Sequence, residues 1–272
     1  MDIITIGDNV VDCYLDQNIY YPGGNAVNVA VNSKRAGATR VGYIGVFATD
    51  NKAVHIKNAL GKENIEFSYS REVAGKSGQP TVNLTPSGDR VFVSSPQNTV
   101  QHSVKLRLTE EDLIYIGEFD ICHTSCYSHL EEELDRIPKN IKVSFDFSEN
   151  YGEEYLSKVC PNIDFAFFSG ANLSDEEVNH LIKSLSQYNL EVIGITKGDK
   201  PATFIIKNEI YTQDIIDIDV VDTMGAGDSF IGQFLADYSV NGDIKKTLKN
   251  AAKAASVTCT FYGGFGHPQT LD

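Results

Sequence analysis

Short apolar runs and longer amphipathic segments alternate along the chain. The apolar runs are rich in Ile, Val and Phe and predict strands at Asp2–Ile6, Val41–Val46, Phe119–His123, Lys142–Phe147, Phe165–Phe168 and Val192–Thr196. The amphipathic segments repeat apolar residues every three or four positions and predict helices at Ala26–Arg35, Lys52–Glu63, Glu110–Ile116, Ser174–Tyr188, Ala226–Val240 and Ile244–Phe261. Strands that alternate with helices predict an α/β domain with a mostly parallel sheet.

Two segments interrupt this order. Tyr14–Tyr21 is aromatic and predicted to be extended, and Lys76–Val93 alternates around a Pro-Ser-Gly-Asp turn that is typical of a hairpin. We expect these strands to form a small β-sheet that projects from the domain and covers a site; a surface hairpin without function is the alternative. The chain has no internal repeat or linker, so residues 1–272 are predicted to form a single domain, with lid segments at about 13–22 and 65–95.

Composition and charge limit the kinds of protein that this chain can be. It has 272 residues, 42% hydrophobic and 22% charged, which is typical of a globular protein. The net charge of −14 argues against a nucleic-acid partner, although a helix N-terminus or Mg²⁺ can still hold a small anion. No apolar stretch approaches the roughly 18 residues of a membrane span. Asp2 and Asp8 stand where a signal peptide would be basic, so we expect a cytoplasmic protein with no membrane partner.

The five cysteines are scattered and odd in number, which argues against a disulfide framework. Cys122 and Cys126, with His123 between them, could belong to a metal site. No second pair of ligands follows at a zinc-like spacing, so a buried strand and its exit turn is the favoured interpretation.

The most specific chemistry lies near the C-terminus, where an acidic turn and Gly-Ala-Gly lead into an amphipathic helix. Gly225 and Gly227 let backbone N–H groups converge, and the helix dipole favours an anion there. The Asp228 carboxylate would repel that anion, so this pairing is unexpected in a site that only binds an anion. It is expected in phosphoryl transfer, where a base lies beside an anion-binding nest. Alternatively, Asp228 only complements the helix dipole. A dinucleotide fingerprint would need Gly at Phe230, and no P-loop sequence occurs.

Two glycines also precede the first predicted helix, in Gly23-Gly24-Asn25-Ala26-Val27-Asn28. Asn25, Asn28 and Asn32 lie about one helical turn apart. Their amides both donate and accept hydrogen bonds, as sugar hydroxyls do. They could instead be helix caps and polar surface residues.

Together the two segments resemble the two signatures of the ribokinase-like (PfkB) carbohydrate kinases. The matching residues are Gly23-Gly24-x-x-x-Asn28 with Gly37 and Gly45, and Asp222-Thr223-x-Gly225-Ala226-Gly227-Asp228. The resemblance extends over nearly the whole chain and implies a three-layer sandwich with a mostly parallel central sheet and a small β-sheet lid. It also implies that Asp228 is the base that activates the sugar hydroxyl, and that the amides of Gly225, Ala226 and Gly227 form the anion hole.

The same resemblance implies roles for further residues. Asp12, Gly24 and Asn28 match the family's sugar contacts, and Asn25 and Arg90 are further candidates for binding substrate. Arg90 could instead belong to the lid surface, and His123, also considered, to a core strand. Residues that match nucleotide contacts are Asn172, Thr196, Gly198 and Asn250. Asp175 stands where the family's glutamate organises Mg²⁺ through water, and its arm is shorter.

Ribokinases usually carry lysine at the position of Asn25, so ribose is not favoured as the substrate. The chain is most similar to the fructoselysine 6-kinase subgroup. We therefore expect transfer of the γ-phosphoryl group of ATP, with Mg²⁺, to a primary hydroxyl of a sugar, fructoselysine first. The alternatives are a fructokinase, a nucleoside kinase, or a catalytically idle sensor of sugar or nucleotide. A monovalent cation and a homodimer formed through the β-lid also fit the family.

Overall fold

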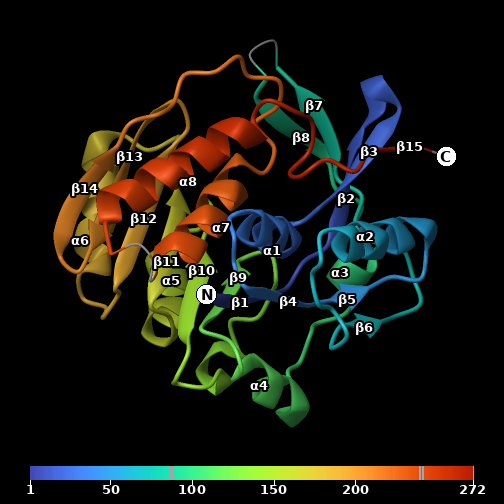
Figure 1. The fold of residues 1–272 in the computed structure, drawn as a ribbon, viewed down its shortest axis with the longest axis horizontal. Helices are drawn as coiled ribbons and strands as arrows, with labels where there is room; N and C mark the ends of the chain where they lie inside the picture. The colour runs from blue at the N-terminus through green and yellow to red at the C-terminus, as the bar shows by residue number, and fades with distance from the viewer. Residues whose placement is uncertain (86–87, 239, 241, 272) are drawn as a thin grey trace.

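A computed structural model of the chain describes residues 1–85, 88–238, 240 and 242–271. Among these residues eight strands form a central sheet, in the order β14-β13-β12-β11-β10-β9-β1-β4 (Figure 1). The strands are β1 (Asp2–Ile6), β4 (Arg40–Ile44), β9 (Ile121–Ser125), β10 (Lys142–Asp146), β11 (Phe165–Ser169), β12 (Val192–Lys197), β13 (Lys200–Ile206) and β14 (Glu209–Gln213). Their buried Ile, Val and Phe side chains form the centre of the hydrophobic core.

The strands from β4 to β12 pair in parallel, which confirms the predicted mostly parallel sheet. β13 and β14 add an antiparallel hairpin at one edge, and the sequence pattern did not predict it. Lys207 and Asn208 connect these two strands with φ angles of 50° and 66°. Positive φ at both residues matches the two-residue turn that joins twisted strands.

Helices cover both faces of the central sheet. The connection through α1 (Asn25–Arg35) runs from β1 toward one edge, whereas the connections from β9 to β12 run toward the other. Because such crossovers are right-handed, opposite directions place their helices on opposite faces. On one face α1 packs against α7 (Ala226–Tyr238), which packs against α8 (Ile244–Thr258), while α5 (Glu153–Val159) and α6 (Asp175–Leu185) cover the other face. The predicted three-layer sandwich is confirmed.

The predicted helices are present, with ends that differ by a few residues. α2 (Asn51–Lys62) and α4 (Glu110–Ile116) complete the set, and the end predicted for α7 adjoins residue 239, which lies outside the described residues. Shorter helices were not predicted: α3 (Val100–Ser103), η1 (Leu15–Gln17), η2 (Leu134–Arg136), η3 (Cys160–Asn162) and α5. Cys122 lies in β9 and Cys126 directly follows it, both buried, as the strand interpretation requires. No helix of the described residues is long and apolar enough to cross a membrane.

A second, smaller sheet projects from this domain, in the order β15-β3-β2-β7-β8; we call it the lid sheet (Figure 1). Its strands are β2 (Val10–Tyr14), β3 (Ile19–Gly23), β7 (Thr81–Leu84), β8 (Arg90–Ser94) and β15 (Gln269–Thr270). The predicted hairpin is present as the antiparallel pair β7–β8, although residues 86 and 87 of its turn lie outside the described part.

Two expectations about the lid need correction. Tyr14–Tyr21 is not one extended segment, because η1 and the left-handed Asn18, with φ of 55°, turn the chain between β2 and β3. Asparagine tolerates that conformation better than most residues. Residues 65–95 do not all join the lid sheet: β6 (Arg71–Glu72) pairs instead with β5 (Val46–Phe47) in a separate two-stranded sheet.

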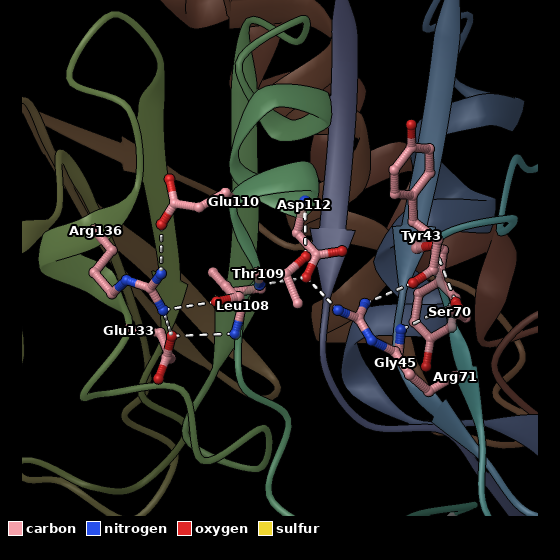
Figure 2. Close-up of polar contacts among 11 residues, drawn as sticks. Tyr43, Gly45, Ser70, Arg71, Leu108, Thr109, Glu110, Asp112, Glu133 and Arg136 are labelled. Atoms are coloured by element: carbon pink, nitrogen blue, oxygen red, sulfur yellow. Dashed lines mark hydrogen bonds and ion pairs between the residues drawn. The ribbon is translucent and has the colours of Figure 1, made fainter.

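Polar contacts hold α4 at the end of the domain opposite the lid sheet (Figures 1 and 2). Thr109 and Asp112 exchange hydrogen bonds in a capping box, and Arg71 from β6 donates to the same carboxylate. Glu133 pairs with Arg136 at 2.7 Å beside this helix. These contacts connect β6, α4 and η2 and give the network a structural role.

Candidate active site

Asp228 connects the two signature segments that the sequence singled out. Its Oδ1 accepts from Asn25 Nδ2 at 2.8 Å and its Oδ2 accepts from Asn28 Nδ2 at 2.7 Å. These partners lie on α1, 203 and 200 residues away along the chain. α1 and α7 pack side by side, so both oxygens of the carboxylate are held in fixed directions.

The turn that leads into α7 forms a nest of backbone donors. Among the described residues, the N–H groups of Gly225, Gly227 and Asp228 have no hydrogen-bond acceptor, whereas Ala226 N donates to Thr223 O at 3.3 Å. Gly225 has φ of +72°, and a Cβ there would lie 2.6 Å from Gly264 Cα, so the turn requires glycine. Free amides at a helix N-terminus favour an anion beside Asp228.

Three more carboxylates, of Asp8, Asp12 and Asp146, surround Asp228 and interact with it or with one another. Asp12 lies on β2, and its Oδ2 is buried without a hydrogen-bond partner among the described residues. Burial, reinforced by the neighbouring carboxylates, raises the pKa of Asp12 to about 7. Asp146, at the end of β10, also has a pKa raised to about 7, first by burial and then by Asp228.

Asp228 itself has properties that suit a general base. Burial raises its pKa to about 6, while hydrogen bonds from Asn28 and Asn25 and the charge of Arg90 limit that rise. Such a carboxylate is ionised at neutral pH and can still take up a proton during a reaction, because its pKa lies near the working pH.

The lid sheet contacts the turn before α7. Gly88 O accepts from Thr223 N at 3.1 Å, and Arg90 N donates to Thr223 Oγ1 at 3.2 Å. The exposed Arg90 side chain also donates to Thr223 O at 3.4 Å and lowers the pKa values of both Asp12 and Asp228. Arg90 therefore belongs to the site, and its contact with the substrate stays a prediction.

The residues expected near the phosphates lie close to the carboxyl ends of β11 and β12. The Thr196 hydroxyl donates a hydrogen bond to Phe168 O at 3.3 Å. Gly198 turns the chain with φ of 62°. Asn172 Nδ2 donates to Glu149 Oε1 at 3.1 Å. Asp175 is exposed and pairs with Lys197 Nζ at 2.5 Å, so its charge is compensated.

Asn172 and Asp175 fit Mg²⁺ only as residues that would act on the ion through its bound water. Mg²⁺ usually keeps several waters and binds through substrate phosphates plus one or two carboxylates. Among the described residues no group of three or more potential ligands surrounds one point. The predicted action of Asp175 on Mg²⁺ through water stays a prediction.

Asn250, the last predicted nucleotide residue, lies on α8. Its Nδ2 donates to Asp237 Oδ2 on α7 at 2.7 Å, and it lines a hollow of about 400 Å³ with Asn32 and Arg35. A second hollow, of about 630 Å³, lies between β14, the segment 214–216 and the residues Lys245 and Lys249 of α8. The predicted contact between Asn250 and adenine stays a prediction.

A model of the pfkB family carbohydrate kinases matches residues 2–268. The chain belongs to this family. It is 42% identical to the fructosamine kinase FrlD of Bacillus subtilis (strain 168), over 100% of this chain and 96% of that protein. It is 30% identical to the fructoselysine 6-kinase of Escherichia coli (strain K12), over 97% and 99% of the two chains. Arabidopsis thaliana ribokinase complexed with ribose and ATP superimposes with a TM-score of 0.80 at 18% identity, over 96% and 93% of the chains.

These comparisons confirm the predicted family, the ribokinase-like fold and sugar kinase activity. They also confirm the likeness to the fructoselysine 6-kinase subgroup. The roles of single residues in this carbohydrate kinase stay predictions that the geometry supports to different degrees. Asn25, Asn28 and Asp228 are in direct contact, and Asp12, Arg90 and Gly225 lie around them.

The sequence analysis missed two carboxylates of this carbohydrate kinase. Asp8 follows β1 and accepts from the backbone N–H groups of Asn25 at 2.8 Å and Ala26 at 3.2 Å, which fixes the start of α1. Asp146 accepts from Asn25 Nδ2 at 2.8 Å. Both lie at the carboxyl ends of parallel strands, where α/β proteins place their sites, and that position was a usable signal.

Proposed function

We propose that this carbohydrate kinase transfers the γ-phosphoryl group of ATP to the 6-hydroxyl of a fructosamine such as fructoselysine. The observation that carries the phosphoryl transfer is Asp228, fixed by two amides beside a nest of free backbone donors. The names of the fructosamine kinase and the fructoselysine 6-kinase compared above support the fructosamine.

The charge of the site agrees with that substrate. Asp8, Asp12, Asp146 and Asp228 lie close enough to raise one another's pKa, and Arg90 faces Asp12 and Asp228 as a counter-charge. A fructosamine carries an amine that is cationic near neutral pH, and carboxylates attract it. Fructose and nucleosides lack that charge.

In the proposed reaction Asn25 and Asn28 hold the Asp228 carboxylate toward the sugar hydroxyl, and Asp228 accepts its proton as the oxygen attacks phosphorus. The amides of Gly225 and Gly227 donate to the transferring phosphoryl group. The lid sheet, bonded to Thr223, excludes water from this step. Mg²⁺, when bound with ATP, supplies neutralisation of the phosphate charge.

The test is ADP release measured over fructoselysine, fructose, ribose and a set of nucleosides. We expect the highest kcat/KM with fructoselysine, and fructose serves as the control that keeps the ketose but lacks the amine. Higher kcat/KM with fructose would favour a fructokinase, and higher kcat/KM with a nucleoside would overturn the sugar assignment. Binding of ligands without turnover of any of them would favour the idle sensor.

We also propose that two copies pair through the lid sheet. β8 is its edge strand and exposes Val91, Phe92 and Val93. Unpaired strand edges with apolar side chains pair readily with a second chain. Light scattering of the wild type and of Phe92→Lys tests this dimer. The cytoplasmic location and the monovalent cation stay predictions.

A further inference from the structure

The amide of Asn25 contacts three side chains at once. Its Nδ2 donates to Asp146 Oδ2 and to Asp228 Oδ1, both at 2.8 Å. Its Oδ1 lies 3.1 Å from Nε2 of His123 on β9. The amide group therefore uses both of its N–H bonds on carboxylates and its oxygen on the imidazole.

These contacts determine which ring nitrogen of His123 carries the proton. Ionised carboxylates only accept hydrogen bonds, so Asn25 must turn its NH₂ group toward Asp146 and Asp228. Its oxygen then faces His123, which makes Nε2 the protonated nitrogen. Nδ1 accepts, and its partner at 2.9 Å is the hydroxyl of Ser144 on β10. The hydrogen bonds are therefore all donated in one direction, from Ser144 to His123, from His123 to Asn25 and from Asn25 to Asp228.

We propose that His123 is a positioning residue of the kinase reaction, because its Nε2–H fixes the Asn25 amide in the orientation that holds Asp228 for catalysis. This inference rests on the proposed function for its kinetic consequences. His123 is completely buried in the core, and burial lowers its pKa to about 3, so the imidazole stays neutral. It acts through Asn25 and does not touch the reacting atoms.

Without the His123 donor, only the two carboxylates would hold the amide, and its buried oxygen would have no partner. A rotation of the amide toward another donor would weaken its hydrogen bond to Asp228. Because the hydrogen bond from Asn25 lowers the pKa of Asp228, its loss raises that pKa. The other titratable groups that face Asp228 are Asp8, Asp12, Arg90, Tyr127 and Asp146, and they are left in place.

Two amide substitutions at the same position separate positioning from packing. In His123→Gln the new amide nitrogen takes the place of Nε2 and can still donate to Asn25. In His123→Asn the shorter side chain places its amide nitrogen only where Nδ1 was, near Ser144, so the hydrogen bond to Asn25 is lost. We expect His123→Gln to keep kcat within about threefold, and His123→Asn to lower it about 10²-fold, as a misplacement of about 1 Å does. In His123→Asn the acidic limb of the kcat–pH profile moves to higher pH, while KM changes little.

Thr124→Val is the matched control on the same strand. It removes a buried hydrogen bond, from Thr124 Oγ1 to Ile6 O at 2.7 Å, that does not lead to Asn25. It should lower thermal stability without moving the acidic limb. Equal kcat and equal pH profiles for His123→Gln and His123→Asn would overturn the proposal.

A second measurement needs neither a variant nor turnover. Nitrogen NMR of wild type labelled with ¹⁵N-histidine reports the tautomer of each imidazole. We expect His123 to be protonated at Nε2 and to stay neutral at pH 5; protonation at Nδ1 would overturn the proposal. If the wild type phosphorylates no fructosamine, the proposed function fails, while the tautomer still decides the positioning role.

Discussion

The hydroxyl of Tyr14, on the lid sheet, donates a hydrogen bond to the buried carboxylate of Asp222 in the turn before α7. Asp222 also accepts from the backbone N–H groups of Met224 and Gly263, each at 2.9 Å. One carboxylate thus holds together the lid sheet, the nest of backbone donors and the C-terminal loop. A movement of the lid sheet is therefore coupled to the geometry of the nest.

Tyr14→Phe tests this coupling. The Asp222 oxygen loses its side-chain donor in a buried place, so we expect unfolding in urea to become easier by about 1–3 kcal/mol. We also expect a higher KM for the sugar, because the lid sheet is less firmly attached. Tyr155→Phe is the control, since its hydroxyl donates to the Glu131 carboxylate at 2.6 Å away from the lid. A raised KM in the control alone would contradict the coupling.

The same substitution is expected to have different effects at two glycines of the nest. A Cβ at Gly225 would lie 2.6 Å from Gly264 Cα, on a backbone with φ of +72°, whereas a Cβ at Gly227 meets nothing within 4 Å. We expect Gly225→Ala to lower the free energy of unfolding by more than about 1 kcal/mol, since alanine is strained there. Gly227→Ala should keep the melting temperature. Equal melting temperatures for the two variants would contradict the close approach of Gly225 to Gly264.

The starts of α1 and α7 could be predicted from the sequence because their signals are local. Glycines before an amphipathic segment, and Asp228 in the first turn, indicate these helix starts without knowledge of the fold. The β13–β14 hairpin was missed, since Lys207 and Asn208 adopt positive φ without the glycine that usually announces such a turn.

The second layer of the site depends on the fold. His123 and Asp146 belong to neighbouring parallel strands, and the pairing of β9 with β10 brings both side chains to Asn25, more than 90 residues away along the chain. In the sequence His123 is one polar residue in an apolar strand, and only the spatial contact separates a positioning residue from a core histidine.

Asp228→Asn tests the base. The amide keeps the volume of the side chain but cannot take the proton of the sugar hydroxyl, so we expect kcat to fall about 10²–10⁴-fold. ATP should bind as well or slightly better, because a negative charge beside the nest is removed. ADP release measures turnover and calorimetry measures binding; Asp135→Asn, an exposed carboxylate of η2, is the control. Turnover within a few-fold of the wild type would show that Asp228 is not the base.

Asp12 predicts a pH-dependent gain in stability when its charge is removed. Burial raises its pKa in the folded protein to about 7, from about 3.8 unfolded, so the folded state binds the proton more tightly. The contribution of Asp12 to stability is therefore greatest at low pH and is lost as pH rises toward 7.

Asp12→Asn does not titrate, so we expect the stability advantage of this variant over the wild type to grow by about 1–2 kcal/mol between pH 5.5 and pH 8. Urea unfolding of both proteins at the two pH values measures this difference, from which the titration of groups that do not interact with Asp12 cancels. An advantage that shrinks as pH rises would mean that Asp12 is stabilised as a carboxylate, as it would be if Arg90 outweighed its burial. The same variant should raise KM for a fructosamine, because the carboxylate that destabilises the empty site is one that would bind the substrate's cationic amine.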